Sequence, residues 1–176
     1  MNIVLIGYRC AGKSTVGKRL SDRTLMRFVD TDDLIEECHG VLIRDMVRSH
    51  GWDHFRKMER KIIKEISAQD NLIIALGGGA VLDPENIMIL KKNGLIIWLK
   101  ADREVLLKRM GEDPRTIFKR PTLTGKGVLE ELEEVMAYRA PLYERAAEIE
   151  LDTSVLDVEA AVEGVLSILQ ERIKRA

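Results

Sequence analysis

The loop GYRCAGKST at residues 7–15 constrains the fold of this chain more than any other stretch. It has a glycine, four free positions and then Gly-Lys-Ser, and it directly follows the apolar run at residues 3–6. A strand that leads through such a loop into a helix directs backbone N–H groups at one spot, where a phosphate chain is held. Lys13 would place its charge over the outer phosphates, and the Ser14 hydroxyl would ligate magnesium. The stretch therefore predicts a nucleoside triphosphate site.

A chain of 176 residues is long enough for one domain with its own core and short for two. Its net charge of -1 provides no general attraction for nucleic acid or membranes. The sequence enters an apolar strand pattern at once, without a signal-like segment or an apolar run of membrane-spanning length. We therefore expect a cytoplasmic monomer that binds neither nucleic acid nor membranes.

Short apolar runs alternate with stretches of helical periodicity along the chain. Strands are predicted at residues 2–6, 27–29, 72–76, 95–99 and 149–151. Helices are predicted from residue 13, from residue 32, and at residues 43–68, 84–92, 103–110, 128–147 and 158–173, with interruptions at Gly51 and Pro141. Buried strands that alternate with helices are typical of a parallel sheet covered on both faces, which places the chain in the α/β class.

A long basic loop is predicted at residues 111–127, where hydrophobic periodicity is absent and prolines, glycines and basic residues accumulate. Loops of this length inside a compact domain are usually functional or disordered. The helix that follows begins with an acidic run, and we expect its carboxylates to form a solvated face. The residues of that face are Glu130, Glu131, Glu133 and Glu134.

Two aspartates follow the second predicted strand, at Asp30 and Asp32. Their carboxylates should lie at the carboxyl edge of the sheet, beside the phosphate-binding loop. One can hold magnesium, and the other can face an acceptor hydroxyl as a general base or orienting group. The alternative is that both cap the following helix. Because the pair stands at a strand end beside a phosphate site, the functional interpretation is favoured.

Three glycines, Gly77, Gly78 and Gly79, follow the next buried strand. They would let the backbone approach a ligand closely or would form a tight turn, and the sequence leaves both interpretations open. Arg56 and Glu59 are spaced three apart on one helix face. They form either a plain surface pair or an arginine held by a carboxylate to receive an anionic ligand.

Together these segments resemble the shikimate kinase family over essentially the whole chain. The matching segments are the loop at residues 7–15, DTD at 30–32, FRKME at 55–59, GGGA at 77–80, RP at 120–121 and RAPLY at 139–143. The resemblance implies a P-loop three-layer sandwich in which helices flank a five-stranded parallel sheet. It also implies one domain over residues 1–176, with a mobile lid at about residues 111–127. The implied reaction transfers the γ-phosphate of ATP to the 3-hydroxyl of shikimate, with Mg²⁺ as cofactor.

The resemblance also implies roles for individual residues. ATP would be bound by Cys10, Ala11, Gly12, Lys13, Ser14 and Thr15, with Arg120 reaching it from the lid and Arg109 stacking on adenine. Magnesium would be held by Ser14 and Asp30. Shikimate would be bound by Asp32, Arg56, Gly77, Gly78, Gly79 and Arg139. The catalytic set would be Lys13, Asp32 and Arg120.

Two other functions remain open from the sequence. The first is another small-molecule kinase of this fold, acting on gluconate or a nucleoside monophosphate, although two arginines suit a small carboxylate better. The second is a catalytically silent ATP-binding module that regulates a partner, although such a module has no use for an acceptor-side base. Arg9 is an additional cation in the phosphate loop, and the sequence does not indicate what it contacts.

Overall fold

The computed structural model describes residues 1–113 and 127–175 of the chain. Its five strands form one sheet in the order β2-β3-β1-β4-β5, and every pair is parallel. The strands are β1 (Asn2–Ile6), β2 (Arg27–Asp30), β3 (Leu72–Ala75), β4 (Gly94–Lys100) and β5 (Ile149–Asp152). The helices are α1 (Lys13–Arg23), α2 (Thr31–His39), α3 (Ile43–Ser67), η1 (Ala80–Leu82), α4 (Pro84–Lys91), α5 (Arg103–Glu112), α7 (Val128–Ala146) and α8 (Val158–Arg175). The predicted five-stranded parallel sheet is confirmed.

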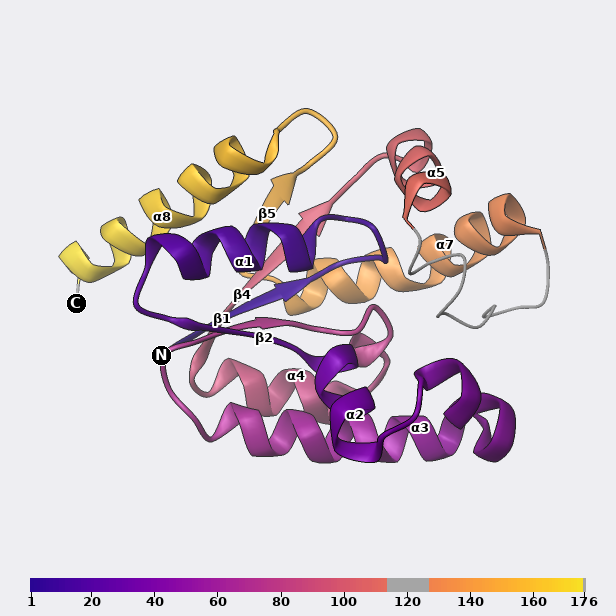
Figure 1. The fold of residues 1–176 in the computed structure, drawn as a ribbon. Coiled ribbons are helices and arrows are strands. Elements are labelled where there is room, and N and C mark those ends of the chain that lie inside the picture. The colour runs from indigo at the N-terminus through magenta and orange to yellow at the C-terminus, as the bar shows by residue number, and fades with distance from the viewer. Residues whose placement is uncertain (114–126, 176) are drawn as a thin grey trace.

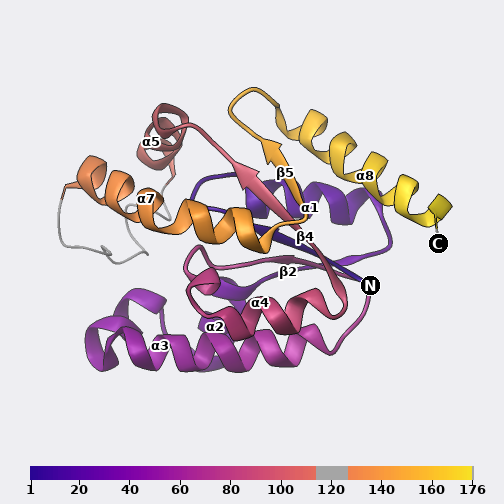
Figure 2. The same ribbon diagram turned by 180° about the vertical axis from the view of Figure 1, so that it is seen from behind.

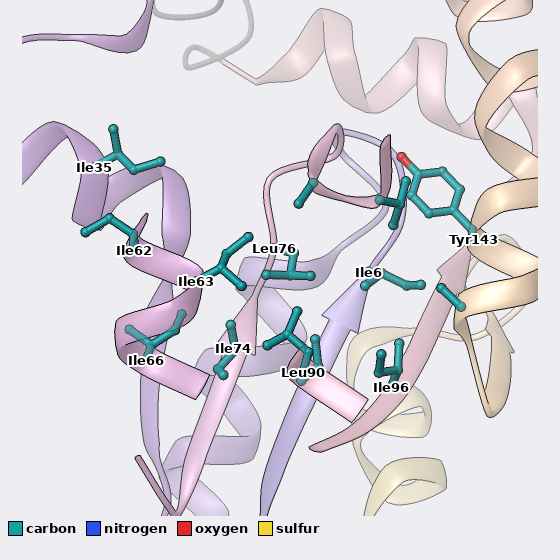
Figure 3. Packing of buried hydrophobic residues seen from close by; sticks show 14 of the residues in the cluster. Ile6, Ile35, Ile62, Ile63, Ile66, Ile74, Leu76, Leu90, Ile96 and Tyr143 are labelled. Atoms are coloured by element: carbon teal, nitrogen blue, oxygen red, sulfur yellow. The ribbon is translucent and has the colours of Figure 1, made fainter. Parts of the chain in front are cut away.

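Helices cover both faces of the sheet, with α3 and α4 on one side and α1 and α8 on the other (Figures 1 and 2). The alternation of side chains along β1 shows why both faces are apolar. Val4 and Ile6 join the core shared with α3 and α4, while Ile3 and Leu5 join the core shared with α1 and α8. Figure 3 shows the first core, in which isoleucines of α3 pack against β1 and β3. The three layers follow from strands that are buried on both faces.

The structure changes two of the predicted boundaries. Helix α5 continues to Glu112, so the segment predicted as a loop starts two residues later than expected; the first proline after the helix is Pro114. Helix α7 runs without interruption through Pro141, which was predicted to break it. The break predicted at Gly51 is confirmed, because its φ of 81° and ψ of 171° are not helical. No helix in the described ranges is both long and apolar enough to cross a membrane.

Candidate active site

The phosphate-binding loop connects β1 to α1 at the carboxyl edge of the sheet. Gly7 has a φ of 141°, and a Cβ there would lie 2.5 Å from the Leu99 carbonyl oxygen, so only glycine fits. Gly12 precedes α1 with a φ of 97°, and no side chain caps the helix. The N-terminus of α1 therefore opens into a cavity of about 810 Å³. Its phosphate end is lined by Cys10, Gly12, Lys13, Ser14 and Thr15, and Asp30, Asp32 and Arg109 also line it.

Lys13 is held inside this loop. Its Nζ donates hydrogen bonds of 2.8 Å to the carbonyl oxygens of Gly7 and Tyr8, and the side chain is buried. Both acceptors belong to the loop itself, so the ammonium group is fixed within the loop that would hold the phosphates.

Asp30 caps the following helix and also contacts the phosphate-binding loop. Its Oδ1 accepts the backbone N–H of Asp32 at 3.0 Å and so caps α2, while its Oδ2 accepts the Ser14 hydroxyl at 2.6 Å. Asp32 lies one residue inside α2 and is not the capping residue. The cap interpretation therefore holds for Asp30 and not for Asp32, which lines the cavity beside the loop.

A second cavity, of about 70 Å³, adjoins the first. Asp32 and Gly78 line both cavities, so the junction lies between these two residues. The remaining lining residues of this acceptor cavity are Tyr8, Arg9, Ile43, Trp52, Phe55, Arg56, Glu59, Gly77, Gly79 and Arg139. The structure thus brings together residues from the phosphate-binding loop, α2, α3, the loop after β3 and α7.

The glycines after β3 make room for charged side chains. A Cβ on Gly77 would lie 2.5 Å from Oδ1 of Asp32, and one on Gly79 would lie 2.1 Å from Nη2 of Arg56. The loop also turns here, since the N–H of Ala80 donates to the carbonyl of Gly77 at 3.0 Å. The tight-turn interpretation is therefore confirmed, whereas close approach of a ligand stays a prediction. The groups that approach it are side chains of the protein.

Arg56 and Glu59 form a buried pair rather than a surface pair. Nη1 of Arg56 donates to Oε2 of Glu59 at 2.6 Å, and Glu59 is 1% exposed. Burial, together with the weaker effect of the Asp32 carboxylate, raises the pKa of Glu59 to about 7, although the charge of Arg56 opposes this rise. The guanidinium carbon of Arg56 lies 5.5 Å from the Trp52 ring centroid. Arg56 is therefore fixed from two sides at the wall of the acceptor cavity.

Arg139 has a different environment from Arg56. It is 7% exposed, and in the described part of the chain no carboxylate forms an ion pair with it. Tyr143 lies one turn further along α7 and donates its hydroxyl to the carbonyl of Gly78, and burial raises the pKa of this phenol to about 12. Figure 3 shows Tyr143 at the edge of the core. A buried cation without a counter-ion is costly, so the cavity favours an anionic ligand.

Arg109 lines the larger cavity, which we call the nucleotide cavity, and its Nη1 donates to the carbonyl oxygen of Cys10 at 3.4 Å. Its guanidinium donates to the carbonyl oxygen of Thr153 at 2.7 Å and to its hydroxyl at 3.1 Å. Thr153, Leu156 and Val158 line the cavity beside it. This location suits the predicted adenine contact, although stacking itself stays a prediction.

One predicted site residue stays untested, and one predicted surface is partly wrong. Arg120 and the rest of residues 114–126 lie outside the described residues. The prediction of a solvated acidic face is wrong for Glu131, which is 2% exposed and forms an ion pair with Arg9. The buried positions of α7 recur at helical spacing, and Glu131 falls on that stripe with Val135 and Arg139. This period was visible in the sequence, but the four acidic residues obscured it.

Comparison with known proteins agrees with this geometry. The family model described as shikimate kinase matches residues 9–170. Shikimate kinase of Syntrophus aciditrophicus is 38% identical over 97% of this chain and 92% of its own length. Shikimate kinase 2 of Yersinia enterocolitica is 38% identical over 98% of both chains.

Solved structures give the same result at the level of the fold. The solved structure of shikimate kinase from Acinetobacter baumannii in complex with shikimate aligns with a TM-score of 0.89 at 29% identity, covering 97% of this chain and 93% of that one. Two adjoining cavities, a phosphate loop and a match along almost the whole length all point the same way: this chain belongs to the shikimate kinase family.

Proposed function

We propose that the larger cavity binds ATP and the smaller one binds shikimate, and that the γ-phosphoryl group crosses the junction between them. The products would be shikimate 3-phosphate and ADP, in the route to chorismate and the aromatic amino acids. The observation that carries this proposal is Arg139, a buried cation without a carboxylate partner in the described residues. With Arg56 it lines the cavity that shares Asp32 with the nucleotide cavity. A small carboxylate with ring hydroxyls matches this arrangement of charge.

The proposed chemistry uses four residues. Arg139 and Arg56 hold the acceptor carboxylate, which directs the 3-hydroxyl toward Asp32. The hydroxyl oxygen bonds to the γ-phosphorus as the bond from this phosphorus to the β–γ bridging oxygen breaks, and the hydroxyl proton passes to Asp32. Lys13 neutralises charge on the phosphates as ADP leaves.

Mg²⁺ fits the phosphate end of the nucleotide cavity. The Ser14 hydroxyl and the Asp30 carboxylate are hard oxygen ligands 2.6 Å apart, and both line this cavity. When bound with ATP, the ion would neutralise phosphate charge. Few protein oxygens are needed, because Mg²⁺ keeps water and phosphate oxygens as its other ligands.

The remaining assignments rest on the family resemblance. We assign Arg109 to adenine, backbone groups at residues 77–79 to the acceptor, and Arg120 to ATP from a lid at about residues 111–127 of a single domain, residues 1–176. All residues proposed for the reaction come from one chain, so a monomer suffices. ATP with Mg²⁺ is a cytoplasmic substrate, and we place the enzyme in that compartment.

A coupled assay of ADP release with Mg-ATP tests the proposal. Four reactions are compared: shikimate, gluconate, a nucleoside monophosphate and no acceptor. We expect release that depends on shikimate alone, and a loss of about 10²- to 10⁴-fold in turnover for Asp32→Asn with retained ATP binding. Release with gluconate or a nucleotide instead would reassign the acceptor. ATP binding without release in any reaction would indicate a silent ATP-binding module.

A further inference from the structure

Arg9, the additional cation of the phosphate loop, pairs with a residue far away in the sequence. Its Nη2 contacts Oε1 of Glu131 near the start of α7, and the two side chains are 11% and 2% exposed. Ion pairs with so little exposure are weakly screened by solvent, and losing one partner leaves an uncompensated buried charge. The pair therefore ties α7 to the phosphate loop.

The Arg9 side chain belongs to the acceptor side of the loop. Arg9 lines the acceptor cavity, and the nucleotide cavity is lined by residues that start at Cys10. Its guanidinium carbon lies 5.4 Å from the ring centroid of Tyr8, which lines the same cavity and is 2% exposed. In the described ranges, Nε of Arg9 and the hydroxyl of Tyr8 are buried without a hydrogen-bond partner. Buried polar atoms of this kind usually have a ligand or water as a partner.

Arg139 lies between two attachment points on α7. Glu131 is two turns before it and joins Arg9, and Tyr143 is one turn after it and donates to the carbonyl of Gly78. All three are buried positions of one helix. The charges of Arg9, Glu131 and Arg139 all act on the Tyr8 hydroxyl, which places the four groups in one cluster. Movement of the first turns of α7 would therefore shift the guanidinium of Arg139.

We propose that Arg9 is a positioning residue for the acceptor carboxylate: its ion pair with Glu131 holds α7 against the phosphate loop and so keeps Arg139 in place. Arg9 does not replace Arg139 as the anion ligand, because Glu131 already neutralises its charge. The inference rests on the proposed function, in which Arg139 binds the carboxylate. It makes the acceptor site depend on the phosphate loop through an ion pair whose residues do not line the nucleotide cavity.

The test compares binding of shikimate with binding of its methyl ester, which lacks the negative charge. Dissociation constants are measured by calorimetry for the wild type, Arg9→Ala, Arg9→Ala with Glu131→Gln, and Arg139→Ala. The double variant removes both charges and remains informative if the buried Glu131 destabilises the single variant. Arg103→Ala is the matched control, because Arg103 of α5 forms an exposed ion pair with Glu133, which lies on α7 as Glu131 does.

We expect the Arg9 variants to weaken shikimate binding about tenfold, the effect of one misplaced charge-assisted hydrogen bond. Binding of the ester and the KM for ATP should change less than about twofold, and Arg103→Ala should behave as wild type. An unchanged preference for the acid over the ester in both Arg9 variants would overturn the inference, as would an equal rise in the KM for ATP. If Arg139→Ala also kept that preference, the carboxylate assignment itself would fail.

Discussion

The nucleotide cavity and the acceptor cavity meet at Asp32 and Gly78, yet they are built in different ways. The phosphate end of the first comes from one continuous loop, whose left-handed glycines and helix N-terminus supply backbone N–H groups. The second is lined by residues from five separate segments, and its charged residues are buried or half-buried. A phosphate site can therefore be formed locally, whereas the carboxylate site exists only where α3, the loop after β3 and α7 meet.

The cations of the two cavities also differ in the groups that pair with them. Lys13 is fixed by two carbonyls of its own loop, and Arg56 by Glu59. Arg139 has a phenol one turn away and no ion-pair partner in the part of the chain described. Among the described residues, this unequal neutralisation makes Arg139 the cation that we propose binds the carboxylate of the acceptor. Four substitutions test this difference between the two cavities.

The largest effect is expected on the nucleotide side, from Lys13→Ala. Turnover should fall about 10³-fold, because the charge that offsets the migrating phosphoryl group is lost. The chain should still fold, since the sheet and both cores remain. Steady-state kinetics and circular dichroism measure the two effects, with exposed Lys64→Ala as the control. An unfolded variant would show that Lys13 is mainly structural.

Arg139→Ala should act on the acceptor side alone. We expect the KM for shikimate to rise about 30- to 100-fold, the cost of losing hydrogen bonds to a charged group. The KM for ATP should change less than about twofold. Arg145→Ala, at an exposed position on the same helix, is the control. Equal rises in both KM values would mean that the charge of Arg139 supports ATP binding as much as shikimate binding.

Gly79→Ala tests whether Arg56 needs the space that the missing side chain of Gly79 leaves. A methyl group there would lie 2.1 Å from its guanidinium, which must move away. Because a flexible side chain can shift, folding should survive while the KM for shikimate rises about tenfold. Gly111→Ala is the control, since a Cβ at that position meets nothing within 4 Å. A normal KM in Gly79→Ala would remove this role.

The smallest effect concerns the stability contributed by Glu59. Its pKa is raised from 4.5 to about 7, so between these values the unfolded chain is ionised while the folded chain is not. The free energy of unfolding of the wild type, relative to Glu59→Gln, should therefore fall as pH rises from about 4.5 and level off above about 7. Urea denaturation across this range measures the difference. A difference that rises with pH would mean that Arg56 outweighs burial.

Most of the nucleotide side could be predicted from the sequence. The motif at residues 7–15 depends on contacts within a few residues, and the apolar runs showed strands buried on both faces. The sequence also indicated the acidic pair, and the family resemblance assigned Asp30 to magnesium and Asp32 to the acceptor. Only the structure shows that Asp30 caps α2 and contacts Ser14 while Asp32 faces the junction.

On the acceptor side, the sequence did not show which charged residues are buried and paired. Glu131 belonged to an acidic run that looked solvated, and Arg9 had no visible partner, because 122 residues separate them. Pro141 looked like a break, yet α7 continues and keeps Arg139 and Tyr143 one turn apart on the same helix.

The sequence alone determined the strand, the loop and the helix that make the phosphate site, because their geometry depends on neighbouring residues. Tertiary structure decided which charges are paired, which are buried and which face a ligand. The energy of a charge depends on the water and counter-ions around it, and only the packing of distant segments sets these.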